Sequence, residues 1–455
     1  MTSDARAVVK GEVGKVDWSP VRQRADEPVP PGPPARRKAD LRILWWVNGI
    51  DGLGSQASGV VFPLLLLDLG HSPGAAGMFA SAAALVAVVL GPLVAVPADR
   101  GRRRRIMTGS AALAALGMGV LALTCLGRPA LWVVVALALL ERFCAVAYEA
   151  AARGALVHLA AVEELPRAAA GMQAGDQAAL VLGPALGGAL FQLARPVPFL
   201  ADALSYAAAA LGIRAVRSPL DTPAPAPEAP ATGPRPWRRA AAWRAWPGAA
   251  RAGLATVTGS GVLRLVLVWT STAGATLTLL FYTALFELGP GHGAATGLVL
   301  TASGTAGLLG TLTAPAVVRR LGPARVLTAA AWLLPVPCGA LLWAGGAWSW
   351  GVAFAGLSFL LPLITVVLSS LAVACTPAAL QSRAGAVLGS VSALAAAGAP
   401  AAAAVLITEW NASAPALLCT VLFAALAVYT QARARAVLDR AAAATAARKE
   451  GDSGE

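Results

Sequence analysis

Long apolar segments separated by short polar stretches run along most of the chain. Cutting the sequence at charged, Pro-rich and Gly-rich stretches leaves twelve segments, each close to the ~20 residues that a helix needs to cross a hydrocarbon core of about 30 Å. The segments are continuous and rich in Ala and Leu, whereas the strands of a membrane barrel alternate apolar and polar residues. The pattern therefore predicts an all-α membrane protein with twelve transmembrane helices. The predicted spans are 43–67, 74–98, 104–126, 130–157, 169–194, 197–213, 262–287, 294–318, 324–346, 348–372, 384–408 and 412–431.

Two pairs of junctions between these segments repeat along the chain. The stretch LDLGHSPGAAGMF at 67–79 and the stretch FELGPGHGAATGL at 286–298 share an acid, a Leu-Gly, a further Gly and an Ala-Ala pair in register. A second pair follows at nearly the same offset, PADRGRRRRIM at 97–107 and PAVVRRLGPARVL at 315–327. The chain therefore looks like two pseudo-symmetric copies of a six-helix unit, an arrangement typical of transporters whose pathway runs between the halves.

The stretches outside the two copies differ from them in composition. The middle of the chain is Pro-rich and cannot form a membrane helix. Its end carries Trp237, Trp243 and Trp246 among arginines, and is either an interfacial amphipathic helix or a flexible basic segment. We therefore expect a disordered cytoplasmic tail at 1–40, a first half at 41–214, a linker at 215–258, a second half at 259–432 and a cytoplasmic tail at 433–455.

Composition and charge agree with a membrane protein. Hydrophobic residues make up 57% of the chain and charged residues 13%, against about 25% charged residues in soluble domains. The formal net charge of +13 comes mostly from arginines in the stretches on one side of the predicted spans. Cytoplasmic loops collect Lys and Arg, so we expect both termini in the cytoplasm and the chain in the plasma membrane. Topology thus accounts for the basic charge, and no nucleic-acid partner is expected.

The chain lacks the signatures of an enzyme. It has no GxxxxGK[ST] loop, so ATP hydrolysis through a P-loop is excluded. Its five cysteines lie in apolar segments without CxxC or Cys/His spacing, which indicates packing residues rather than a metal site. We expect no cofactor and no metal, and we expect a proton gradient to supply the energy.

Two motifs carry a resemblance to a known family. The stretch PADRGRRRR follows the second segment, and GPALGG at 183–188 lies in the fifth. With two six-helix halves and a basic linker, the chain resembles the major facilitator superfamily. Three further stretches, VFPLLLLDLGHSPGAAGMF, VLGPALGGALF and FLADALSYAAAALG, resemble its enterobactin-exporter and macrolide-efflux branch, which exports hydrophobic natural products with protons as the coupling ion.

The resemblance implies roles for both motifs. In the family, an Asp-Arg pair after helix 2 latches the cytoplasmic side, although here Ala95 replaces the first glycine of the pattern. A charge-assisted lock between helices is one interpretation, and plain topology is the other. The gate candidates are Asp99, Arg100, Arg103 and Arg153. The family's helix 5 motif marks antiporters, because Pro kinks the helix and the glycines permit close approach. The kink residues are Gly183, Pro184, Gly187 and Gly188.

Ionisable residues inside the spans are candidates for proton coupling. A charge at the bilayer centre costs about 2.5–3.5 kcal/mol on insertion scales and is rare without a use. Asn48, Asp51 and Ser55 share one helical face, whereas Thr270 stands at the position of Asp51 in the second copy. Alternatively, Glu141 pairs locally with Arg142 and Glu149 with Arg153. The candidate residues for the proton and substrate cavity are Asn48, Asp51, Ser55, Arg142, Glu149 and Asp176.

The sequence therefore predicts a monomeric secondary transporter that exports a hydrophobic or amphipathic small molecule by proton antiport. Its partners would be a lipophilic substrate, protons and the lipid bilayer. Polar cavity residues are few, and aromatic residues are available for stacking, namely Trp269, Phe281, Tyr282 and Trp332. An importer or facilitator of the same fold remains an alternative, and so does a membrane sensor or scaffold that transports nothing.

Overall fold

The computed structural model describes residues 34–99, 102–159, 165–218, 220, 254–255, 257–289, 293–343, 346–375, 378–411 and 413–452. Every element within these ranges is a helix. The first half contains α2 (Pro34–Asp68), α3 (Pro73–Asp99), α4 (Arg103–Thr124), α5 (Leu131–Leu159), α6 (Leu165–Leu193) and α7 (Val197–Ala215). The second contains α9 (Gly261–Leu288), α10 (Gly293–Leu321), α11 (Pro323–Leu333), α12 (Pro335–Ala340), α13 (Ala347–Cys375), α14 (Ala378–Ala397), α15 (Ala399–Glu409) and α16 (Ala414–Asp452).

The predicted twelve-helix membrane fold is confirmed. Each predicted span coincides with one helix, except that the ninth consists of α11 and α12 and the eleventh of α14 and α15. Among the described residues, nine stretches of helix are long and apolar enough to cross a membrane on their own. In α6, by contrast, the apolar stretch is shorter and covers only Leu182–Leu193.

Proline explains both interrupted spans. Pro335 follows the end of α11, and Pro400 stands in the first turn of α15. A proline ring has no N–H to donate and clashes with the preceding turn, so a helix usually ends before it. Both breaks lie in the second half. In the first half, α4 corresponds to α11 and α12, and α6 corresponds to α14 and α15, and each of these two helices is continuous.

The ends of the chain are more helical than the sequence predicts. Helix α2 begins at Pro34, inside the region 1–40 expected to be disordered, and α16 continues to Asp452, through most of the expected tail at 433–455. Asp40 explains the first difference, because its buried carboxylate accepts hydrogen bonds from the backbone N–H of Arg217 and Ser218 after α7. The Ala-rich sequence after residue 433 has high helix propensity and explains the second. The linker tryptophans Trp237, Trp243 and Trp246 lie outside the described residues.

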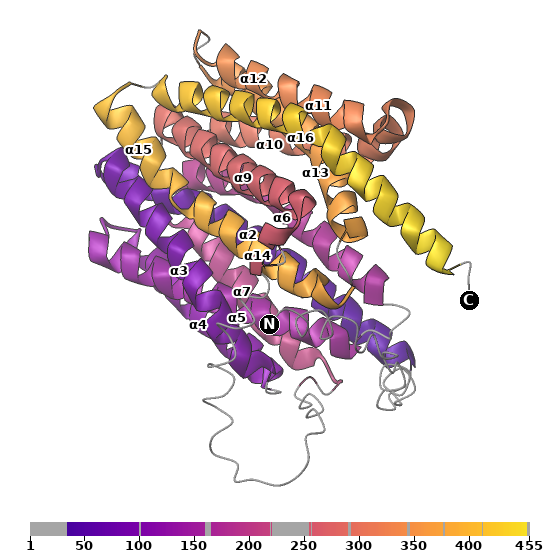
Figure 1. The fold of residues 1–455 in the computed structure, drawn as a ribbon. Helices are drawn as coiled ribbons and strands as arrows, with labels where there is room; N and C mark the ends of the chain where they lie inside the picture. The colour runs from indigo at the N-terminus through magenta and orange to yellow at the C-terminus, as the bar shows by residue number, and fades with distance from the viewer. Residues whose placement is uncertain are drawn as a thin grey trace, which may run out of the picture.

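Two hydrophobic cores divide the bundle. One gathers residues of α2 to α7, and the other gathers residues of α9 to α16. In Figure 1 the indigo-to-magenta helices accordingly lie on one side and the salmon-to-yellow helices on the other. Leu285 of α9 is fully buried in the core of the first half, and Phe281, Tyr282 and Phe286 pack against both cores. The halves therefore meet around the end of α9.

We define the two ends of the bundle by the helix ends that lie there. The terminal face is the end at which α2 begins and α7 ends, and the far face is the end at which α2 ends and α3 begins. Near the far face, α3 packs closely against α15 of the other half. A Cβ atom on Gly77 would lie 2.6 Å from the carbonyl oxygen of Pro400, and Ser81 Oγ accepts a hydrogen bond of 2.9 Å from the N–H of Ala401. The halves are thus in tight contact at the far face.

Candidate functional site

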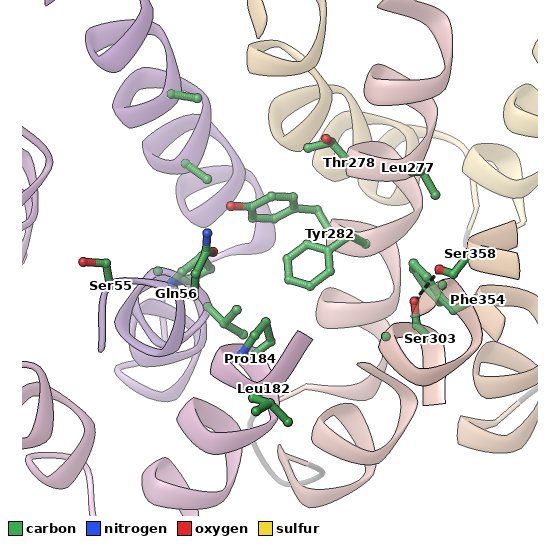
Figure 2. Close-up of a pocket in the computed structure, with 18 of the residues that line it drawn as sticks. Ser55, Gln56, Leu182, Pro184, Leu277, Thr278, Tyr282, Ser303, Phe354 and Ser358 are labelled. Atoms are coloured by element: carbon green, nitrogen blue, oxygen red, sulfur yellow. Dashed lines mark hydrogen bonds between the residues drawn. The ribbon is translucent and has the colours of Figure 1, made fainter. Parts of the chain in front are cut away.

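A chamber of about 1030 Å³ lies between the two halves. Its walls come from α2, α3, α5 and α6 on one side and from α9, α10 and α13 on the other. Figure 2 shows side chains from both sides pointing into it, including Gln56, Pro184 and Tyr282. Most lining residues are apolar, as in most small-molecule sites.

Aromatic rings gather in the part of the chamber nearer the far face. Phe62 and Phe79 of the first half have ring centroids 6.1 Å apart, and Phe281 and Tyr282 of the second half 5.2 Å apart. Phe354 of α13 also lines the chamber. These residues lie within about three turns of the far-face ends of their helices, so the rings form one end of the cavity.

Two of the four aromatic residues expected to stack on a substrate lie outside the chamber. Trp269 is buried in the core of the second half and donates a hydrogen bond of 2.8 Å to Thr430 Oγ1. Trp332 is 46% exposed and donates to Gln431 at 2.7 Å. Neither lines the chamber, whereas Phe281 and Tyr282 do. Apolar and aromatic residues occur all around these helices, so the sequence alone did not separate the chamber face from the core face.

A second, polar pocket of about 430 Å³ lies within the first half, among α2, α5 and α6. It shares Ser55, Gln56 and Arg142 with the chamber. All six residues predicted for the proton and substrate cavity line it, namely Asn48, Asp51, Ser55, Arg142, Glu149 and Asp176. The structure thus brings together side chains that are distant in sequence and places them beside the chamber.

Asp51 is the buried acid of this pocket. It is 8% exposed, and among the described residues its Oδ1 atom has no hydrogen-bond partner. It interacts electrostatically with Glu141, Glu149 and Arg142. One turn earlier, the Asn48 side-chain oxygen also lacks a partner within the described residues. Buried polar groups are nearly always hydrogen-bonded, so these two atoms make Asp51 and Asn48 the candidate polar site of the pocket.

A hydrogen-bonded network connects the pocket to α7. Tyr206 donates a hydrogen bond of 2.6 Å to Glu141 Oε1, and its oxygen lies 2.9 Å from Ser55 Oγ. Glu141 also lies 3.7 Å from the guanidinium group of Arg142. The local Glu141–Arg142 pairing foreseen as an alternative is therefore present. The guanidinium group makes no hydrogen bond within the described part of the chain, and its side chain is 37% exposed.

Neither Tyr206 nor the polar face of α7 was identified from the sequence as part of the site. Asp202, Ser205 and Tyr206 stand at i, i+3 and i+4 of α7, a spacing that places polar groups on one helical face. Asp202 is fully buried, and Ser205 Oγ donates to it at 3.3 Å. That face packs against α2, where a Cβ atom on Gly54 would clash with Ser205 and Asp202. The repeated spacing was the available signal for the missed residues.

The second half has no acid at the corresponding place. Thr270, which stands where Asp51 stands in the first copy, accepts a hydrogen bond of 2.8 Å from Ser392 of α14. Ser392 also lies 3.3 Å from Ser271. The two halves therefore match in fold and differ in charge at equivalent positions.

The predicted gate residues are described only in part. Asp99 ends α3, but neither its side chain nor Arg100 is within the described part of the structure. Arg103 is buried and lies against Gly154 of α5 in the same half. Arg153 forms an exposed i, i+4 ion pair with Glu149, which is the alternative foreseen for these two residues. The gate thus stays a prediction.

The GPALGG motif is a contact between α6 and α2. A Cβ atom on Gly183 would lie 2.5 Å from Gln56 Cβ, and one on Gly187 would lie 2.3 Å from the carbonyl oxygen of Ala57. Gly188 is also buried, and α6 continues through Pro184 as one helix. The glycines therefore serve close helix packing beside the two pockets.

Comparison with known proteins assigns this architecture to a family. The profile of the Major Facilitator Superfamily matches residues 44–400. Among solved structures, the nucleoside transporter NupG superimposes with a TM-score of 0.62 at 12% sequence identity, over 86% of this chain and 98% of that one. A bacterial homologue of the iron transporter ferroportin, in an inward-facing state, gives 0.57 at 18% identity, over 86% and 98%.

A human protein has the same fold. The human organic anion transporter MFSD10 superimposes with a TM-score of 0.57 at 19% identity, over 87% of this chain and 99% of that one. No curated protein matches the chain in sequence. The named transporters carry different cargoes, so their likeness shows the fold alone. Together with the match over residues 44–400, it leads to one conclusion: the chain belongs to the Major Facilitator Superfamily and is a membrane transporter rather than an enzyme.

Proposed function

We propose that this transporter exports a hydrophobic or amphipathic small molecule in exchange for protons. One observation carries the proposal: the apolar chamber and the polar pocket with the buried Asp51 share three wall residues, Ser55, Gln56 and Arg142. A substrate in the chamber and a proton in the pocket would therefore act on the same side chains. Such differential contact is what couples two binding events.

Arg142 is the residue through which we expect coupling. It is paired with Glu141 at 3.7 Å and interacts electrostatically with Asp51. A proton on Asp51 removes one of the negative charges that Arg142 faces, and this changes the position that its guanidinium group favours. Because Arg142 also lines the chamber, that change alters the substrate site. Binding of a proton at Asp51 then weakens binding of the substrate, and the reverse, which is the coupling that antiport needs.

The orientation of the chain follows from its arginines. Arg103, Arg104 and Arg105 begin α4 at the terminal face, and Arg319 and Arg320 end α10 there. Because cytoplasmic ends collect Lys and Arg, we infer that the terminal face is cytoplasmic and that the protein resides in the plasma membrane. Because α3 packs tightly against α15 near the far face, we infer that the chamber takes up substrate from the cytoplasmic side. A rocking motion of the halves would open the far face.

A transport assay in inverted membrane vesicles tests the proposal. Lipophilic fluorescent dyes are added outside the vesicles, and a pH gradient with an acidic interior is imposed. Export in the cell corresponds to dye uptake here, so we expect accumulation that a protonophore abolishes. An importer would accumulate dye only in right-side-out vesicles, a facilitator would equilibrate dye without responding to the gradient, and a scaffold would move none. Each of these three results contradicts the proposal.

A further inference from the structure

Two unpartnered polar side chains face the chamber from opposite halves. Gln56 projects from α2 and is exposed, and Tyr282 projects from α9 and is half-buried. Within the described residues, neither the Gln56 amide nor the Tyr282 hydroxyl makes a hydrogen bond, although an amide and a phenol both donate and accept. Figure 2 shows both side chains pointing into the space between the halves. A ligand there can satisfy both groups at once.

The position of Gln56 is determined by its helix neighbours. The Cβ atom of Gln56 occupies the space that a side chain on Gly183 would need, so the missing side chain of Gly183 lets α6 pack onto α2 at this level. Tyr282 packs in turn edge-to-face with Phe281 and against Phe286, whose ring centroid lies 5.9 Å away. Both polar groups are thus presented from packed helices rather than from loops, which favours a defined site.

The surroundings of this pair indicate what the ligand looks like. On the far-face side lie the rings of Phe62, Phe79, Phe281 and Phe354, which suit a flat aromatic or fused-ring body. On the wall of the second half, Ser303 and Ser358 hydrogen-bond to each other at 2.6 Å and so have only part of their capacity left. Apart from the Arg142 guanidinium group, the side chains of the chamber with unused hydrogen-bonding capacity are therefore mainly Gln56 and Tyr282, one in each half.

The charge of the chamber wall argues for an uncharged ligand. Glu141 and Arg142 are the carboxylate and the guanidinium group that line it, and they form an ion pair with each other. Their formal charges cancel. An anion would compete with Glu141 for Arg142, and a cation would compete with Arg142 for Glu141, so a ligand of either charge weakens the existing ion pair.

We propose that the chamber binds an uncharged molecule with a fused-ring aromatic body and a carbonyl or hydroxyl group, which hydrogen-bonds to Gln56 of one half and Tyr282 of the other. The inference rests on the proposed transport function and names the substrate class for it. The cavity of about 1030 Å³ is at the upper limit of drug-sized sites, so several fused rings fit. A ligand that bridges the halves would also favour the state in which both groups reach it.

Equilibrium binding to the purified protein, without any gradient, tests this inference. The probe is an uncharged aminonaphthyl ketone dye whose emission depends on polarity. We expect Tyr282→Phe and Gln56→Leu each to weaken ketone binding by about two- to tenfold, the range for one lost hydrogen bond. An analogue without the carbonyl group should bind both variants and the unaltered protein equally. A saturated decalin ketone and a quaternary ammonium derivative should both compete at least about threefold less well.

Matched controls separate binding from folding. Tyr429→Phe removes a hydroxyl and Phe143→Leu removes a ring, and neither residue lines the chamber. Both should leave dye binding unchanged, and every variant is checked by its thermal unfolding temperature. The inference is overturned if the ketone dye binds the Tyr282→Phe and Gln56→Leu proteins as tightly as the unaltered one, or if the decalin ketone or the ammonium derivative competes equally well. Selective binding without proton-driven flux would instead refute the transport proposal and leave this inference standing.

Discussion

Tyr206 donates a hydrogen bond of 2.6 Å to Glu141, and both side chains are buried inside the first half. The same hydroxyl oxygen lies 2.9 Å from Ser55 Oγ, so Tyr206 of α7 connects α5 to α2. Glu141 in turn faces Arg142, which lines both the chamber and the polar pocket. A single phenol therefore orders the wall that the two pockets share.

Loss of this hydroxyl should destabilise the first half. Tyr206→Phe keeps the buried ring and removes the donor to Glu141, and a hydrogen bond to a charged group contributes about 1.5–3 kcal/mol. We expect a lower thermal unfolding temperature and reduced dye efflux. Tyr429→Phe is the matched control, because Tyr429 lies beside Arg433 in the middle of α16 and should tolerate the change. Equal unfolding temperatures for the two variants would show that the Tyr206–Glu141 bond contributes nothing.

Gly187 should tolerate no side chain. A Cβ atom there would lie 2.3 Å from the Ala57 carbonyl oxygen, and this backbone atom cannot move without shifting α2. We expect Gly187→Ala to lower stability by about 1–3 kcal/mol, typical of overpacking, and to reduce transport. Gly119→Ala adds the same methyl group where no atom lies within 4 Å and should be neutral. Thermal unfolding in detergent compares the two variants. An unfolding temperature of Gly187→Ala equal to that of the unsubstituted protein would disprove the close α2–α6 contact.

The closed far face can be locked. Gly77 and Ala404 lie on opposite halves, and a Cβ atom on Gly77 would approach Ala404 Cβ to 2.8 Å. A Gly77→Cys, Ala404→Cys double variant should therefore form a disulfide after a small adjustment, since bonded cysteines have Cβ atoms about 3.5–4.5 Å apart. We expect the cross-link to stop dye transport and a reductant to restore it. Each single cysteine variant should transport equally well under oxidising and reducing conditions. Transport by fully cross-linked protein would mean that the far face need not open.

Much of the fold could be predicted because the membrane restricts the choices. A chain in lipid must satisfy its backbone hydrogen bonds within helices, so the apolar segments were enough to place all twelve spans. The breaks at Pro335 and Pro400 were not anticipated, because a proline in a membrane helix can be accommodated by a kink or by an interruption. The helical start at Pro34 was missed because it depends on Asp40 meeting the segment after α7, a contact distant in sequence.

The polar pocket could be predicted better than the chamber. Acids and arginines are so rare within the spans that Asp51, Arg142 and Asp176 stood out individually, and the structure places them around one cavity. Aromatic and hydroxyl side chains are common in every span, so nothing in the sequence separated Tyr282 and Gln56 from Trp269, which the core buries. Their roles depend on how the two halves pack together, and no local sequence pattern predicts that packing.

The most direct test of proton-coupled export compares Asp51→Asn with Glu287→Gln in liposomes under an imposed pH gradient. Both changes remove one carboxylate, but Glu287 lies near the far face, where Trp350 donates to it, and does not line either pocket. The account predicts that Glu287→Gln still accumulates dye against its gradient. Asp51→Asn should lose that accumulation while it still exchanges dye at equal concentrations. If Asp51→Asn accumulated dye with the same pH dependence as the unaltered protein, the coupling role of this pocket would be contradicted.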